Sequence, residues 1–154
     1  MDMQDHIGLG TLLRRVVAAL DGGAQQVYDR LGAEFRPRYF PVARHLLDHG
    51  PTAVSQLSEG LGTTQPAVSQ TLKEMEQDGL IDFAAGEDRR VRLAALSAKG
   101  LALCHLLQPV WVAAARSAEE IGAEIGADLS DLLHRLLFAL DQRSFATRIE
   151  EKLK

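Results

Sequence analysis

The sequence has little of what several protein classes require. A single cysteine among 154 residues excludes an internal disulfide and favours a reducing, cytoplasmic setting. The N-terminal MDMQDHIGLG lacks the basic-then-apolar order of a secretion signal, and no apolar run reaches bilayer-spanning length. The pattern also has no phosphate-binding glycine loop, nucleophile elbow or carboxylate pair in a predicted cleft. We therefore expect neither an enzyme nor a membrane protein, and no metal or cofactor.

Positive charge is also scarce. Lys and Arg total 17 against 21 Asp and Glu, which gives a formal net charge of −4. Because nonspecific affinity for nucleic acid comes from basic charge, any DNA-binding surface on this chain must be local. A hydrophobic content of 46% with 25% charged residues is typical of a soluble globular protein.

The stretch from Leu57 to Leu72, LSEGLGTTQPAVSQTL, has the pattern of a helix-turn-helix. Gly62 tolerates the positive φ of a turn, Thr64 is a good N-cap, and Pro66 falls in the first turn of the second helix. Thr52 is expected to cap the first helix. The second helix has apolar residues at helical spacing, which predict one buried stripe: Val68, Leu72 and Met75.

The side of the second helix opposite this stripe carries hydroxyls, amides and one lysine, with no carboxylate between Gln65 and Lys73. Such groups suit phosphates and base edges in a major groove. The residues that we expect to contact DNA here are Thr64, Gln65, Pro66, Ser69, Gln70 and Lys73. The alternative is a solvated helix face in an ordinary three-helix bundle.

A β-hairpin is predicted directly after the second helix. Residues 80–83 and 91–93 alternate as short strands around a polar tip. Arg89 and Arg90 at this tip could enter a minor groove, where narrow A·T-rich DNA concentrates negative potential. Alternatively, they are solubilising turn charges offset by Glu87 and Asp88.

Long helices are predicted at both ends of the chain. The first has an apolar repeat that keeps its phase across Gly22 and Gly23, which favours one helix: Leu9, Leu13, Val16, Leu20, Val27 and Leu31. Ser97 caps a later helix that contains Pro109, and Leu129 to Leu140 form another amphipathic helix. Stripes of this size exceed what a small winged domain can cover and usually mark an interface.

The chain resembles the MarR family of transcriptional regulators along nearly its whole length. The most specific features are Asp88-Arg89-Arg90 in the hairpin and the Leu96-Ser97-x-x-Gly100 start of the next helix. Two departures are Ser97, where threonine is usual, and the single lysine, Lys73, in the recognition helix.

The resemblance implies a mainly α fold with a small β-hairpin. It places a winged helix-turn-helix at about 36–96 and dimerisation helices at about 6–34 and 97–153, in a single MarR-like chain 1–154. It also implies a homodimeric repressor on a pseudopalindromic operator in double-stranded DNA. In the family pattern, the acid at Asp88 braces the wing while the arginine at Arg90 reaches the minor groove.

The family further implies a cavity for a small aromatic or acidic effector between the winged domain and the dimer helices. The candidate residues for the lining of this cavity are Arg14, Arg15, Arg44, His45 and Trp111. The alternatives are a winged helix that only binds proteins, or a regulator that responds to metal or redox state. The metal alternative rests on His45, Asp48 and His49 with His105 as a third ligand, and the redox alternative on Cys104. Packing roles are favoured for all of these.

Overall fold

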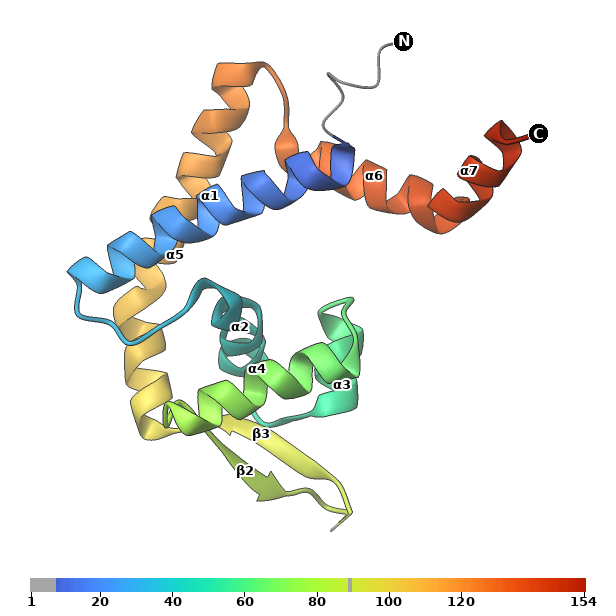
Figure 1. The fold of residues 1–154 in the computed structure, drawn as a ribbon. Coiled ribbons are helices and arrows are strands. Elements are labelled where there is room, and N and C mark those ends of the chain that lie inside the picture. The colour runs from blue at the N-terminus through green and yellow to red at the C-terminus, as the bar shows by residue number, and fades with distance from the viewer. Residues whose placement is uncertain (1–7, 89) are drawn as a thin grey trace. The chain divides into compact units, whose positions relative to one another are not determined.

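The computed structural model describes residues 8–88 and 90–154. Two compact units make up the chain, Met1–Gln108 and Pro109–Lys154. The elements in chain order are α1 (Leu9–Arg30), the short 3-10 helix η1 (Pro37–Tyr39), α2 (Phe40–His49), β1 (Thr52–Ala53), α3 (Val54–Gly60), α4 (Gln65–Gln77), β2 (Ile81–Ala85), β3 (Arg92–Leu96), α5 (Ala98–Ile125), α6 (Leu129–Gln142) and α7 (Phe145–Lys152). The predicted fold, mainly α with a small β-hairpin in a winged helix-turn-helix, is confirmed (Figure 1).

Helix α1 runs without interruption through Gly22 and Gly23, as the unbroken apolar phase predicted. Two adjacent glycines cost about 2 kcal/mol in a helix interior. The chain leaves the helix at Gly32, whose φ of 64° is a conformation that glycine adopts without steric cost. Most of the apolar stripe of α1 is exposed, including Leu9, Val16 and Leu20.

The helix-turn-helix forms from α3 and α4 as predicted. Gly62 takes a φ of 61° in the turn, and the Thr64 hydroxyl accepts the Ala67 N–H at 3.4 Å. Pro66 lies in the first turn of α4. The predicted stripe is almost fully buried: Val68, Leu72 and Met75. Burial of these three side chains fixes which side of α4 faces outward.

The predicted hairpin is present, and its strands extend further than expected. Strand β3 pairs antiparallel with β2, with Phe83 opposite Ala94. The two-residue strand β1 joins the other edge of β3, which gives the order β1-β3-β2. Strand β1 was not predicted because two residues carry no periodicity. The predicted capping role of Thr52 is wrong: Thr52 belongs to β1, its hydroxyl donates to the Gly50 carbonyl at 2.8 Å, and Ala53 is the N-cap.

The start of α5 is held tightly against the end of α4 and the start of β2. The Ser97 hydroxyl donates to the Gly79 carbonyl at 2.6 Å and accepts the Gly100 N–H at 3.0 Å. The Ser97 N–H donates to the Leu80 carbonyl. A Cβ on Gly100 would lie 1.9 Å from that carbonyl oxygen, so only glycine fits. The Leu-Ser-x-x-Gly pattern therefore fixes the start of α5 against the turn between α4 and β2.

The unit Pro109–Lys154 contains the rest of α5 together with α6 and α7. Asp128 is the N-cap of α6, and its carboxylate accepts the Asp131 N–H at 2.9 Å. Ser144 is the N-cap of α7, and its hydroxyl accepts the Thr147 N–H at 3.1 Å. The chain leaves helical structure between Gln142, the last residue of α6, and Phe145, the first residue of α7. Large apolar side chains are exposed along these helices: Leu132, Leu133, Leu137, Phe138, Phe145, Ile149 and Leu153.

Helix α5 is more apolar than the sequence analysis allowed. An 18-residue window in Ala98–Ile125 reaches a mean hydropathy of 1.2, which by length and composition is compatible with a membrane span. The core helices of soluble proteins pass the same test. In the first unit, α5 contributes the buried side chains of Cys104 and Leu107. The expectation that no segment reaches this level was too strong.

We predict that Gly100→Ala lowers the free energy of unfolding by about 1–3 kcal/mol, because the new methyl must displace the Leu80 backbone. Gly22→Ala is the matched control, since a Cβ there meets no atom within 4 Å in a helix interior. That variant should gain up to about 1 kcal/mol. Chemical denaturation of both variants measures the difference, and equal effects would contradict the close approach at Gly100.

Candidate nucleic-acid interface

The predicted DNA-facing residues of α4 lie on its outward surface. The side chains of Thr64, Gln65, Pro66, Ser69, Gln70 and Lys73 are all exposed. The N-terminal half of α4 therefore presents hydroxyl and amide groups with one ammonium, as the sequence predicted. The contacts of these groups with DNA remain a prediction.

Strands β2 and β3 with the turn between them form the wing. Hydrogen bonds hold the tip of this hairpin. Gly86 N–H donates to the Val91 carbonyl at 2.8 Å, and Val91 N–H donates to the Asp88 carbonyl at 2.9 Å. The Asp88 carboxylate accepts the Arg90 N–H at 3.0 Å, while Arg90 is exposed. The Asp88 carboxylate thus contacts the backbone of the hairpin tip, and its role as a brace of the wing stays a prediction. Arg89, the other predicted wing contact, lies outside the described residues.

Another arginine of the wing was not singled out from the sequence. The Arg92 guanidinium carbon lies 4.4 Å from the centroid of the Phe83 ring on the neighbouring strand. This cation–π contact holds a positive charge on the hairpin. Its only sequence signal was an alternation of basic and apolar residues in a short strand, which does not distinguish a bound arginine from a solvated one.

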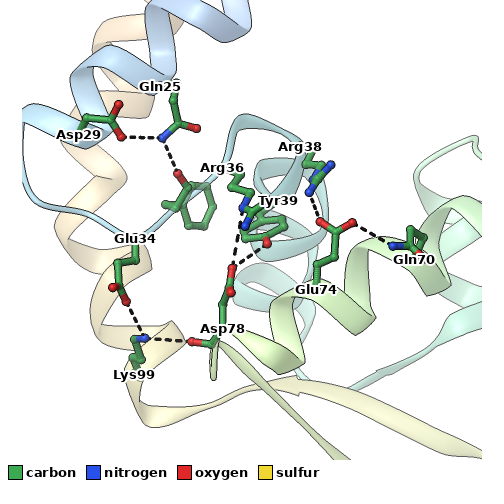
Figure 2. Close-up of polar contacts among 11 residues, drawn as sticks. Gln25, Asp29, Glu34, Arg36, Arg38, Tyr39, Gln70, Glu74, Asp78 and Lys99 are labelled. Carbon is green, nitrogen blue, oxygen red and sulfur yellow. Dashed lines mark hydrogen bonds and ion pairs between the residues drawn. The ribbon is translucent and has the colours of Figure 1, made fainter.

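The segment before α2 places further arginines beside α4 (Figure 2). No sequence pattern singled out these arginines. Arg38 forms an ion pair with Glu74, and the Gln70 amide donates to the other oxygen of the same carboxylate at 3.0 Å. A predicted base-reading amide is thus joined to an unpredicted arginine by one carboxylate, which no local pattern reveals because residues 38 and 74 are 36 apart in the chain.

Asp78, at the end of α4, ties the helix to the same segment. Tyr39 is fully buried, and its hydroxyl donates to the Asp78 carboxylate at 2.7 Å. Burial, and then the neighbouring carboxylate, raise the pKa of Tyr39 to about 12. Arg36 approaches the same carboxylate at 3.9 Å. Edge-to-face contacts continue from Tyr39 to Phe35 and from Phe35 to Tyr28, so an aromatic chain links α4 to the end of α1.

A shallow hollow of about 840 Å³ adjoins this cluster. Lys99 crosses it, donating to Glu34 at 3.0 Å and to the Asp78 carbonyl at 2.9 Å. Its lining is Gln25, Asp29, Gly32, Ala33, Glu34, Phe35, Arg36, Gln77, Asp78 and Lys99. The residues predicted to line an effector pocket are not among these.

The predicted effector residues are spread over three helices. Arg14 and Arg15 are exposed on α1, Arg44 on α2 pairs with Asp48 at 2.7 Å, and His45 on α2 is half-buried. Trp111 belongs to the other unit and is 8% exposed. Their assignment to an effector pocket stays a prediction.

The histidines and the cysteine give no support to a sensing role. His45 stacks on His49 with ring centroids 4.4 Å apart, and the described residues contain no group of three or more metal-ligating side chains. Cys104 is buried, and burial raises the pKa of its thiol to about 11. A buried neutral thiol reacts slowly with oxidants, so packing accounts for this residue.

Comparison with known proteins adds to this geometry. The MarR family model matches residues 35–91. A MarR family regulator from Neisseria meningitidis is 25% identical, with 99% of this chain and 97% of that chain covered and a TM-score of 0.55. No curated protein sequence matches.

Two other solved structures share the fold. The M. tuberculosis transcriptional regulator MOSR, solved in complex with DNA, is 23% identical, with 92% and 98% covered and a TM-score of 0.67. BpsR from Bordetella bronchiseptica, whose DNA binding is regulated by 6-hydroxynicotinic acid, is 19% identical, with 94% and 99% covered and a TM-score of 0.66.

The bond between Tyr39 and Asp78 predicts a pH dependence of stability. A tyrosine whose pKa is raised from 10.0 to about 12 on folding stabilises the protein fully below pH 10, and this contribution is lost between pH 10 and 12. Tyr39→Phe should cost about 0.5–1.5 kcal/mol at pH 8 through the lost hydrogen bond. Urea titrations across this pH range should show the wild-type advantage shrinking. A difference that stays constant to pH 12 would contradict the assignment.

Proposed function

Because the chain belongs to the MarR family of transcriptional regulators, we propose that it binds specific duplex DNA and thereby regulates transcription. The observation that carries this proposal is the outward side of α4, where hydroxyls, amides and Lys73 are exposed while the apolar stripe is buried. A hairpin with an exposed arginine follows α4 in the same compact unit. In a winged helix, the recognition helix enters the major groove of DNA and the hairpin contacts the neighbouring minor groove.

The groups on α4 and the wing are suited to different parts of the duplex. Gln70 and Ser69 can hydrogen-bond base edges in the major groove, and Lys73 can neutralise a phosphate. Arg90 at the wing tip is suited to a narrow minor groove. With a net charge of −4, these local groups must supply the affinity.

The exposed apolar residues of α1, α6 and α7 support a homodimer. Large hydrophobic side chains on an isolated chain rarely form stripes of this length without a partner. A two-fold dimer would place two copies of α4 on half-sites of a pseudopalindromic operator. Such a protein would act as a repressor wherever its operator overlaps a promoter.

A small aromatic or acidic effector would release the DNA by a population shift. BpsR, which has the same fold, has its DNA binding regulated by 6-hydroxynicotinic acid. Such an effector would bind preferentially to a dimer conformation in which the recognition helices cannot enter adjacent grooves. The loss of operator affinity is then limited by the ratio of the effector's affinities for the two conformations. The cytoplasm is the compartment where such a regulator meets its DNA.

The function is tested by titrating the full-length protein against a duplex that it selects from a random pool, at several salt concentrations. Specific DNA binding predicts tight binding to the selected duplex, weaker binding to a scrambled one, and affinity that falls with salt. A winged helix that binds only proteins would bind neither duplex.

Two substitutions in the wing distinguish the effect of its charge on DNA binding from the effect of its geometry. Arg90→Ala should weaken binding to all duplexes, most where the flanks are A·T-rich, and should lower the salt slope by about 2 if each wing of a dimer neutralises one phosphate. Asp88→Ala should also weaken binding although it removes a negative charge, because the tip loses the bond to the Arg90 N–H. Tighter binding by Asp88→Ala would refute the bracing role.

The full-length chain should sediment as a dimer at micromolar concentration. Leu133→Glu, a change that would cost little in a monomer because the side chain is 47% exposed, should shift the protein toward monomer or aggregate. Gln142→Glu, on the polar side of the same helix, is the control and should leave the dimer intact. Analytical ultracentrifugation showing a stable wild-type monomer would contradict the proposal.

A further inference from the structure

Glu74 stands out because its two carboxylate oxygens are used by two different side chains. One oxygen accepts from the Arg38 guanidinium, and the other accepts from the Gln70 amide at 3.0 Å (Figure 2). Gln70 lies on the outward side of the recognition helix, and the Arg38 side chain is 51% exposed. Both donors are therefore accessible to a ligand beside the recognition helix.

We propose that Glu74 is an internal competitor of DNA: in the free protein it occupies Arg38 and Gln70, and binding exchanges its carboxylate for a phosphate and a base edge. This inference rests on the proposed DNA-binding function and adds Arg38 as a phosphate contact. A guanidinium recognises carboxylate and phosphate through the same planar fork of N–H donors, so the exchange keeps the geometry of Arg38.

Arg38 is better placed for this exchange than its neighbour Arg36. The Asp78 carboxylate near Arg36 is already bound by the Tyr39 hydroxyl at 2.7 Å, and Arg36 lies 3.9 Å away from it. Asp78 is thus a structural anchor that a phosphate cannot replace without breaking a buried bond. Among the described residues, Glu74 has no such buried donor, since Arg38 and Gln70 are both exposed.

The competition changes the balance between specific and nonspecific binding. A phosphate contact from Arg38 would strengthen binding to every duplex equally. By holding Arg38 and Gln70, Glu74 lowers the affinity for all sequences, and only an operator that supplies a partner for the Gln70 amide compensates for both lost bonds. Glu74 is therefore a specificity-determining residue that acts without contacting DNA.

Two substitutions at Glu74 separate competition from simple charge repulsion. Glu74→Gln removes the charge, whereas Glu74→Asp keeps the charge and withdraws the carboxylate by one methylene. We expect both to tighten binding to an arbitrary duplex by about two- to fivefold per protomer, the strength of an exposed ion pair. Glu76→Gln, on the same helix and with no ion pair among the described residues, reports the effect of charge alone.

The same substitutions in an Arg38→Ala background complete the test. On an arbitrary duplex, which offers the Gln70 amide no specific partner, competition predicts that Glu74→Gln then gains no more than Glu76→Gln. Charge repulsion predicts an equal or larger gain, because the carboxylate has lost its neutralising arginine. Competition is overturned if Glu74→Asp leaves affinity unchanged, or if the gain from Glu74→Gln persists without Arg38.

Fluorescence anisotropy on the full-length protein measures these affinities, with circular dichroism melts to verify folding of each variant. If the wild-type protein binds no duplex under any salt condition, the proposed function fails and this inference fails with it. If the wild type binds its selected duplex and the cycle between positions 38 and 74 is additive, only the competition is wrong.

Discussion

Burial of Val68, Leu72 and Met75 is the constraint on which the rest of the interface depends. These side chains are at most 2% exposed, so any rotation of α4 about its axis would bring apolar surface into water. At about 25 cal/mol per Å² of apolar surface, such exposure costs several kcal/mol. The outward direction of Gln70 and Lys73 follows from this packing and needs no interaction of their own.

A second constraint acts at the C-terminal end of α4. Asp78 joins α4 to the segment before α2 through the buried Tyr39 hydroxyl, and the Ser97–Gly100 junction joins the end of α4 to α5. The helix is therefore held at its C-terminal end by hydrogen bonds and along its length by apolar contact. In the N-terminal half, the Gln70 amide is held by Glu74 of the same helix, while the Ser69 and Lys73 side chains are exposed.

The acidic net charge of the chain is partly offset near α4 by ion pairs. Glu74 and Asp78 each face an arginine, whereas the exposed Glu76 has no ion pair among the described residues. Ion pairs whose arginine side is exposed, as in both of these, contribute about 0–1 kcal/mol to stability. Their effect lies in which charges remain free for a partner.

The sequence by itself determined the elements whose signal is local. Helical spacing predicted the stripe of α4, capping chemistry predicted Thr64 and Ser97, and alternation predicted the hairpin, because each depends on residues only a few positions apart. Strand β1 was missed for the opposite reason, since two residues form a strand only when β3 lies beside them, and this pairing takes Thr52 out of the predicted capping position. The pairing of Arg38 with Glu74 was likewise decided only by the tertiary structure, because burial of Tyr39 brings together residues that are distant in the chain and have no pattern in common.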